Sequence, residues 1–82
     1  MQMITIYIQA FGILKDFMGK DEFMWELSEG TTVKELKQKI KENYLVHPEL
    51  PIAVVKENKY QKEETVLQNS DHLFLMPPVS GG

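Results

Sequence analysis

The 82-residue sequence contains no cysteine, and all nine of its basic residues are lysine. Without cysteine the chain forms no disulfide, offers no thiolate to zinc and has no reactive or sulfur-bearing thiol of its own. Without arginine it lacks the bidentate donor group that best recognises phosphates and base edges. The formal net charge of -3 also disfavours nucleic acid, which usually binds a basic surface. We therefore expect no nucleic-acid partner.

Long apolar runs and familiar catalytic motifs are missing as well. No run approaches the roughly 18 residues of a membrane span, and residues 1–4 do not begin a signal peptide. We therefore expect a cytoplasmic protein that does not associate with membranes. His47 and His72 lack metal-ligand spacing, and Gly12 and Gly19 do not fit a nucleotide-binding loop. The sequence thus predicts no metal site and no bound cofactor, and we expect a chain that is not catalytic alone.

The N-terminal third has the pattern of two strands joined by a short excursion. Its first apolar residues recur at every second position, which is the period of a half-buried strand: Ile4, Ile6, Ile8 and Ala10. A short helical turn is predicted at Ile13–Met18 and a second strand at Glu22–Ser28. We expect the two strands to pair antiparallel.

One main helix follows. Thr32 is placed to act as its N-cap, and Glu35, three residues later, completes a capping box. Apolar residues then recur at helical spacing and form a single face: Val33, Leu36, Ile40 and Tyr44.

The C-terminal part predicts further strands. We expect strands at 51–56, at 60–62 after a turn at 57–59, and at His72–Met76, where Pro77-Pro78 ends the ladder. One helix packed across a mixed sheet is the α+β, ubiquitin-like β-grasp arrangement. A ferredoxin-like fold is the alternative, but it requires a second substantial helix. We assign 1–76 to the β-grasp domain and 77–82 to a flexible, reactive C-terminal tail.

Strand parity predicts an exposed apolar cluster. If the isoleucines of the first strand point inward, Tyr7 and Phe11 point outward; the same parity in the last strand turns out Phe74 and Met76, together with His72. A β-grasp places these two strands side by side, so the residues would form a partner surface. With the opposite parity they would belong to the core.

The Gly81-Gly82 ending is the remaining candidate for chemistry. It has no side chains and can enter a narrow channel, and glycine lets the backbone follow whatever path the partner imposes. A carboxylate is a poor electrophile, so we expect a separate ATP-using enzyme to activate it as an acyl adenylate. Sulfide attack would then give a thiocarboxylate, so that a chain without cysteine can carry sulfur. An ordinary flexible end with small residues is the alternative.

The chain ends in Leu-Met-Pro-Pro-Val-Ser-Gly-Gly at residues 75–82. This ending resembles that of the small subunit of molybdopterin synthase, of the MoaD and ThiS sulfur-carrier type. Residues 11–19, 32–36 and 65–71 also resemble that family in order and spacing. Three positions depart from the family pattern: Lys15, Val55 and Ser70. Because Ser70 stands where glycine is usual, we expect Asn69 to take the left-handed turn conformation.

The resemblance implies a role in molybdenum cofactor biosynthesis. It implies that a ubiquitin-activating-like (MoeB-type) enzyme adenylates Gly82 and that a sulfur-donor protein supplies the sulfur of the thiocarboxylate. The tail would then insert into the large (MoaE-type) subunit of molybdopterin synthase, within a heterotetramer, and donate sulfur to cyclic pyranopterin monophosphate. The predicted partner-binding residues are Phe11, Tyr60, Phe74, Met76, Pro77, Pro78, Val79 and Ser80.

Three other functions stay open from the sequence. The chain could carry sulfur to thiazole, cysteine or tRNA instead of a pterin. It could be a ubiquitin-like modifier that forms isopeptide bonds, or a passive binding module whose last two glycines have no function.

Overall fold

A computed structural model describes residues 2–44 and 51–77 of the chain. The helices and strands are, in chain order, β1 (Met3–Ala10), α1 (Ile13–Met18), β2 (Glu22–Ser28), α2 (Val33–Asn43), β3 (Ala53–Lys56), β4 (Lys59–Tyr60) and β5 (His72–Met76). Neither helix is long and apolar enough to cross a bilayer within these ranges.

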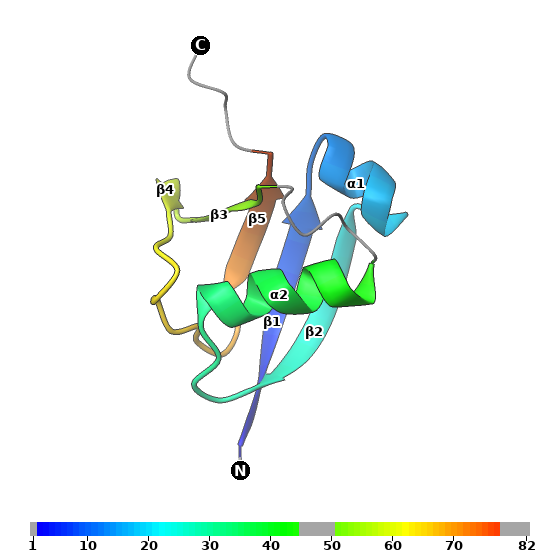
Figure 1. The fold of residues 1–82 in the computed structure, drawn as a ribbon. Helices are drawn as coiled ribbons and strands as arrows, with labels where there is room; N and C mark the ends of the chain where they lie inside the picture. The colour runs from blue at the N-terminus through cyan, green and yellow to red at the C-terminus, as the bar shows by residue number, and fades with distance from the viewer. Residues whose placement is uncertain (1, 45–50, 78–82) are drawn as a thin grey trace.

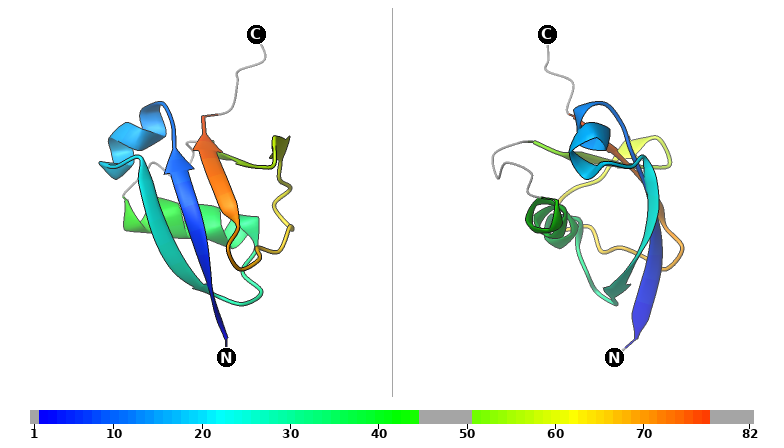
Figure 2. Two further views of the ribbon diagram at one scale, coloured as in Figure 1. Left: turned by 180° about the vertical axis from the view of Figure 1, so that it is seen from behind. Right: turned by 90° about the vertical axis from the view of Figure 1, so that its right-hand side faces the viewer.

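The five strands form one mixed sheet in the order β2-β1-β5-β3-β4. β1 pairs antiparallel with β2 and parallel with β5, so the first and last strands lie together at the centre (Figure 1). α2 crosses one face of this sheet, and no helix of residues 2–44 and 51–77 covers the other face (Figure 2). The predicted β-grasp is confirmed. The ferredoxin-like alternative is excluded because α1 has only six residues, too few for a second packed helix.

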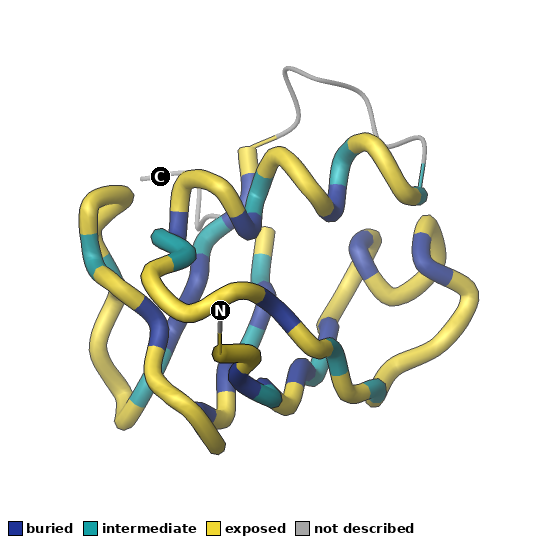
Figure 3. The backbone as a smooth tube through the Cα atoms, turned by 90° about the horizontal axis from the view of Figure 1, so that it is seen from below, coloured by how far each residue is buried: buried dark blue, intermediate teal, exposed yellow. Residues whose placement is uncertain are grey.

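The core lies between α2 and the sheet. Along β1, buried and more exposed residues alternate, as the period of two predicts (Figure 3). The side chains of Ile6, Leu36 and Leu73 have no exposed surface, and each such burial contributes about 1.5–3 kcal/mol. The predicted inward parity of both central strands is therefore confirmed.

The capping box at the start of α2 is also confirmed. The Glu35 N–H donates to Oγ1 of Thr32 (3.3 Å), and the Thr32 N–H donates to Oε1 of Glu35 (3.0 Å). Such a cap contributes about 1 kcal/mol to stability. It fixes where the helix begins, and so which helical face meets the sheet.

The β3–β4 hairpin differs from the predicted boundaries. β3 begins at Ala53, two residues after Pro51, which has no N–H to give a ladder. Glu57 and Asn58 have φ of 53° and 65°, and positive φ at both central residues is the mark of a two-residue type I′ turn. β4 therefore resumes at Lys59 and ends at Tyr60, instead of covering 60–62.

The turn before β5 corrects a second expectation. Ser70, with φ of 70°, takes the left-handed conformation that we expected of Asn69. The side chain of Asn69 is used differently: its Oδ1 accepts the N–H of Thr5 (2.8 Å). Ser70 in turn donates its N–H to the carbonyl of Thr5 (2.7 Å). The turn is thus tied to β1 from two adjacent residues, and this tie fixes the left-handed residue at 70.

Candidate functional site

Four rings form a continuous row on the helix-free face of the sheet, and we call Tyr7, His72, Phe74 and Phe11 the ring cluster. The centroids of Tyr7 and His72 are 6.4 Å apart. His72 stacks on Phe74 at 5.1 Å with an interplanar angle of 25°, and Phe74 meets Phe11 at 5.8 Å. Tyr7 and Phe11 are 41% and 39% exposed. The predicted parity is confirmed, and an apolar surface this exposed is typical of a docking site.

Strand register explains why residues so distant in sequence meet here. Tyr7 lies opposite His72 in the parallel β1–β5 pair. Met76, at the end of β5, lies two residues after Phe74, and every second residue of a strand points to the same face. Side chains of directly paired residues share one face of the sheet. The predicted residue Met76 is therefore on the same face as the ring cluster and is half-buried beside it.

Tyr60 joins this face from the far edge of the sheet. Phe74 pairs with Val55, and Val55 pairs with Tyr60, so the three side chains follow one row across β5, β3 and β4. Tyr60 is 64% exposed, whereas Val55 is only 8% exposed. Val55 is one of the departures from the family pattern. Its buried side chain lies between Phe74 and Tyr60, which are both predicted contact residues.

The loop after β1 places Phe11 beside the end of β5. The N–H of Phe11 donates to the carbonyl of Leu75 (3.0 Å). Gly12 follows, and a β-carbon built on it would lie 3.2 Å from Cγ of Pro77, the first residue of the predicted tail. Pro77 is exposed at the end of β5, next to Met76. Other predicted residues lie outside the described part of the chain, and their roles stay predictions: Pro78, Val79, Ser80, Gly81 and Gly82.

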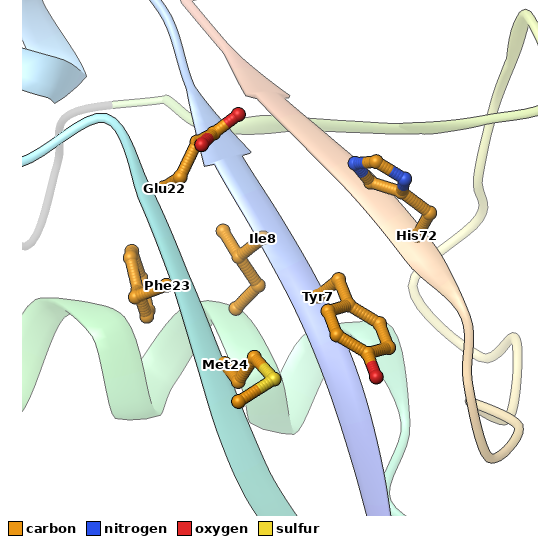
Figure 4. Close-up of a pocket in the computed structure, with 6 residues that line it drawn as sticks. All are labelled: Tyr7, Ile8, Glu22, Phe23, Met24 and His72. Carbon is orange, nitrogen blue, oxygen red and sulfur yellow. The ribbon is translucent and has the colours of Figure 1, made fainter.

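A shallow hollow of about 270 Å³ lies at one end of the ring cluster. Figure 4 shows the side chains of Tyr7, Met24, Glu22 and His72 around it, contributed by three adjacent strands. Ligand sites for small molecules are usually concave and enclose most of their ligand. An open hollow on a sheet suits a side chain inserted by a docked protein.

An ion pair between a half-buried lysine and a buried carboxylate lies next to the ring cluster in sequence and structure. Nζ of Lys56 lies 2.7 Å from Oδ1 of Asp71, which is 8% exposed, and Oδ2 of Asp71 accepts the N–H of Gln68 (2.8 Å). The backbone carbonyl of Asp71 accepts the N–H of Tyr7 (2.8 Å). Asp71 therefore fixes the start of β5 against β3 and β1, and with it the positions of His72 and Phe74.

Three exposed apolar residues near the cluster were not predicted as contacts. Ile13 and Phe17, on the outer side of α1, are 48% and 46% exposed, and Met24 of β2 is 62% exposed. The signal was present for each. Ile13 and Phe17 are four residues apart and therefore lie on one side of α1, about 100° round the helix axis from the buried pair Leu14 and Met18. Among residues 2–44 and 51–77, no three acidic or histidine side chains gather as a metal site.

Comparison with known proteins gives one family match. The sequence profile described as the ThiS family matches residues 8–82, nearly the whole chain, including the terminal Gly-Gly. A search of curated protein sequences found no significant match.

Solved structures agree in fold. A Pyrococcus furiosus protein provisionally described as molybdopterin converting factor subunit 1 superposes with a TM-score of 0.84, at 22% identity, over 93% of this chain and 99% of that one. Small archaeal modifier protein 1 of H. volcanii gives 0.76 at 15% identity, over 93% and 99%. Its counterpart from Methanosarcina acetivorans gives 0.71 at 20% identity, over the whole of both chains. At these identities the likeness establishes the fold.

Proposed function

The chain belongs to the ThiS family of ubiquitin-like sulfur carriers, and from this premise we propose that it carries sulfur on the carboxylate of Gly82 for the synthesis of molybdopterin. The family match over residues 8–82 carries the proposal, because it extends to the two glycines on which the chemistry depends. The Pro-Pro-Val-Ser-Gly-Gly ending and the name of the P. furiosus structural relative favour the pterin pathway over other sulfur acceptors.

The chemistry begins with activation. A carboxylate oxygen of Gly82 attacks the α-phosphate of ATP on an adenylating enzyme, which releases pyrophosphate and leaves an acyl adenylate. Sulfide attacks the carbonyl carbon, AMP leaves, and the terminus becomes a thiocarboxylate. The chain itself contributes an ending that can enter a narrow active site, because glycine at 81 and 82 adds no side chain.

The ring cluster, together with Met76 and Tyr60 on the same face, supplies the docking surface in this proposal. Phe74 and Met76 lie on β5 directly before Pro77, where the tail begins. A large subunit that covers Phe11, Phe74, Met76 and Tyr60 would receive the tail at the edge of the same interface. Apolar and aromatic anchors at the centre of an interface usually supply most of the binding energy.

Modification of proteins through isopeptide bonds is the second candidate. The names of two structural relatives, both small archaeal modifier proteins, favour it. It uses the same acyl adenylate but a lysine amine in place of sulfide. Conjugates that carry a Gly-Gly remnant on lysine would support this candidate.

Reconstitution separates these pathways. Thiocarboxylated protein is mixed with the cognate large subunit and cyclic pyranopterin monophosphate, and the product is quantified against a variant that lacks Gly81 and Gly82. We expect molybdopterin from the full chain alone. Thiocarboxylated protein that forms no pterin product would contradict the pathway and leave the carrier chemistry standing.

A further inference from the structure

The outer edge of β2 is a second candidate binding surface, because its backbone can pair with an added strand. β2 is the end strand of the sheet (Figure 1), and its register with β1 continues without a bulge from Ser28 opposite Met3 to Glu22 opposite Gln9. Natural edge strands are usually protected by brevity, proline or a bulge. β4, at the other edge, has only two residues, whereas β2 has seven and contains no proline.

The phase of the β1–β2 ladder determines which backbone groups face outward. Ala10 donates its N–H to the carbonyl of Asp21 (2.8 Å), and at the other end Glu29 donates to the carbonyl of Gln2 (3.0 Å). Bonded and non-bonded pairs alternate along an antiparallel ladder. The odd-numbered residues of β2 therefore bond to β1, and the even-numbered ones turn their N–H and C=O groups away from the sheet.

Three consecutive outward positions remain unused. Within residues 2–44 and 51–77, no internal hydrogen bond engages the outward backbone groups of Glu22, Met24 and Glu26. An extended segment placed beside β2 would pair with them by strand addition. Its side chains would then alternate between the two faces of the sheet, as those of β2 do.

On the α2 side, such a segment would meet aromatic rings. Phe23 and Trp25 contact edge to face at 5.5 Å, and Trp25 stacks on Tyr44 at 6.1 Å with an interplanar angle of 27°. All three rings are half-buried, so each keeps some surface for an added neighbour. Apolar side chains opposite Phe23 and Trp25 would extend this packing.

On the other face, the segment would meet negative charge. Glu22 and Glu26 are exposed on either side of Met24, and neither forms an ion pair with another described residue. Opposite charges directly across a strand pair attract, and like charges repel. We propose that the edge of β2 accepts an extended segment of a partner protein in which apolar residues alternate with lysine or arginine.

A second copy of this chain does not meet that requirement. Antiparallel self-pairing centred on Met24 would place Glu22 of each copy opposite Glu26 of the other. Like charges at both positions oppose such a dimer. The same two glutamates thus disfavour self-association and favour a basic segment.

The test uses the full chain, labelled for amide NMR, and two synthetic heptapeptides. One alternates lysine with valine, and the other alternates glutamate with valine. We expect the lysine peptide alone to bind, with the largest amide shifts at Glu22, Met24 and Glu26. In the double variant Glu22→Lys, Glu26→Lys the preference should invert, with an affinity change of about tenfold for each peptide.

Met24→Pro is the second variant. It removes an outward N–H without breaking a bond to β1, so the sheet should be retained and the lysine peptide should bind about tenfold more weakly. Unchanged amide shifts in β5 and α2 would confirm that the variant is folded. The proposal would be overturned by shifts centred on the ring cluster, by equal binding of both peptides, by no binding, or by a dimer formed through β2.

Discussion

Gly12 lies against the ring of Pro77 so closely that a β-carbon on Gly12 would stand 3.2 Å from Cγ and 3.5 Å from Cδ of that proline. Gly12 also has φ of 61° and ψ of -139°, a conformation open essentially to glycine alone. Glycine at position 12 therefore allows the loop that follows β1 to pack closely against Pro77, the first residue of the tail. This contact links a glycine near the N-terminus to the direction in which the chain leaves β5.

Gly12→Ala should disturb the close packing of Gly12 against Pro77. The added methyl group must displace Pro77, and we expect the rate of sulfur transfer to the pterin precursor to fall by about tenfold or more, since small misplacements of a reacting group are costly. Gly19→Ala is the control for a glycine in the ordinary left-handed conformation: Gly19 has φ of 72° and ψ of 7°, and a β-carbon there meets no atom within 4 Å. Equal loss of activity in both variants would mean that neither the contact with Pro77 nor the special backbone conformation of Gly12 is responsible.

Met76→Lys should weaken docking to the large subunit more than it destabilises the fold. A lysine in a desolvated interface core is expected to cost about 2–4 kcal/mol of binding, measurable by calorimetry with the isolated subunits. Met3→Lys is the control, because Met3 is 55% exposed at the opposite end of the central strands. If the isolated Met76→Lys chain is unfolded, Met76 belongs to the core and the assigned interface is wrong.

The contributions of Lys56 and Asp71 to the free energy of unfolding should be coupled. Lys56→Met leaves the carboxylate of Asp71 buried without its cation, and we expect a loss of about 1–3 kcal/mol in the free energy of unfolding. Denaturant unfolding of Lys56→Met, Asp71→Asn and the double variant gives the coupling energy. The Lys15–Asp21 pair is longer, at 3.9 Å, and more than half exposed, so Lys15→Met should change stability by less than about 0.5 kcal/mol. Additive losses at Lys56 and Asp71 would exclude the coupling.

Ser70→Gly should stabilise the protein. Ser70 has φ of 70°, a left-handed conformation that costs a residue with a β-carbon about 1–2 kcal/mol. Glycine relieves this strain but loses more entropy on folding, so we expect a net gain of about 0.5–1 kcal/mol. A drop in thermal stability would show that the serine side chain contributes more than the strain it imposes.

Local sequence signals predicted most of the fold. The alternation from Ile4 to Ala10 fixed the inward face of β1, and the Thr32–Glu35 capping box fixed the start of α2; both depend on residues close together in the chain. The end of β4 and the left-handed residue were not predicted. At position 70, long-range hydrogen bonds from the turn to Thr5 decide the geometry, and local preference, which favours asparagine, does not express them.

Local sequence patterns also predicted part of the ring cluster. Parity along two regular strands placed Tyr7 and Phe74 on one face. Tyr60 was identified only through the family resemblance, because a two-residue strand is too short to show alternation. The free edge of β2 required the sheet order and the phase of its ladder, which a single sequence does not contain.

The most direct test of sulfur carriage is the intact mass of the chain after incubation with its cognate adenylating enzyme, ATP and a sulfur source. We predict a gain of about 16 Da, because sulfide replaces one carboxylate oxygen, and fragmentation should locate it at Gly82. The variant that lacks Gly81 and Gly82 should show no gain. An unchanged mass in the full chain, or sulfur bound at another residue, would contradict the account.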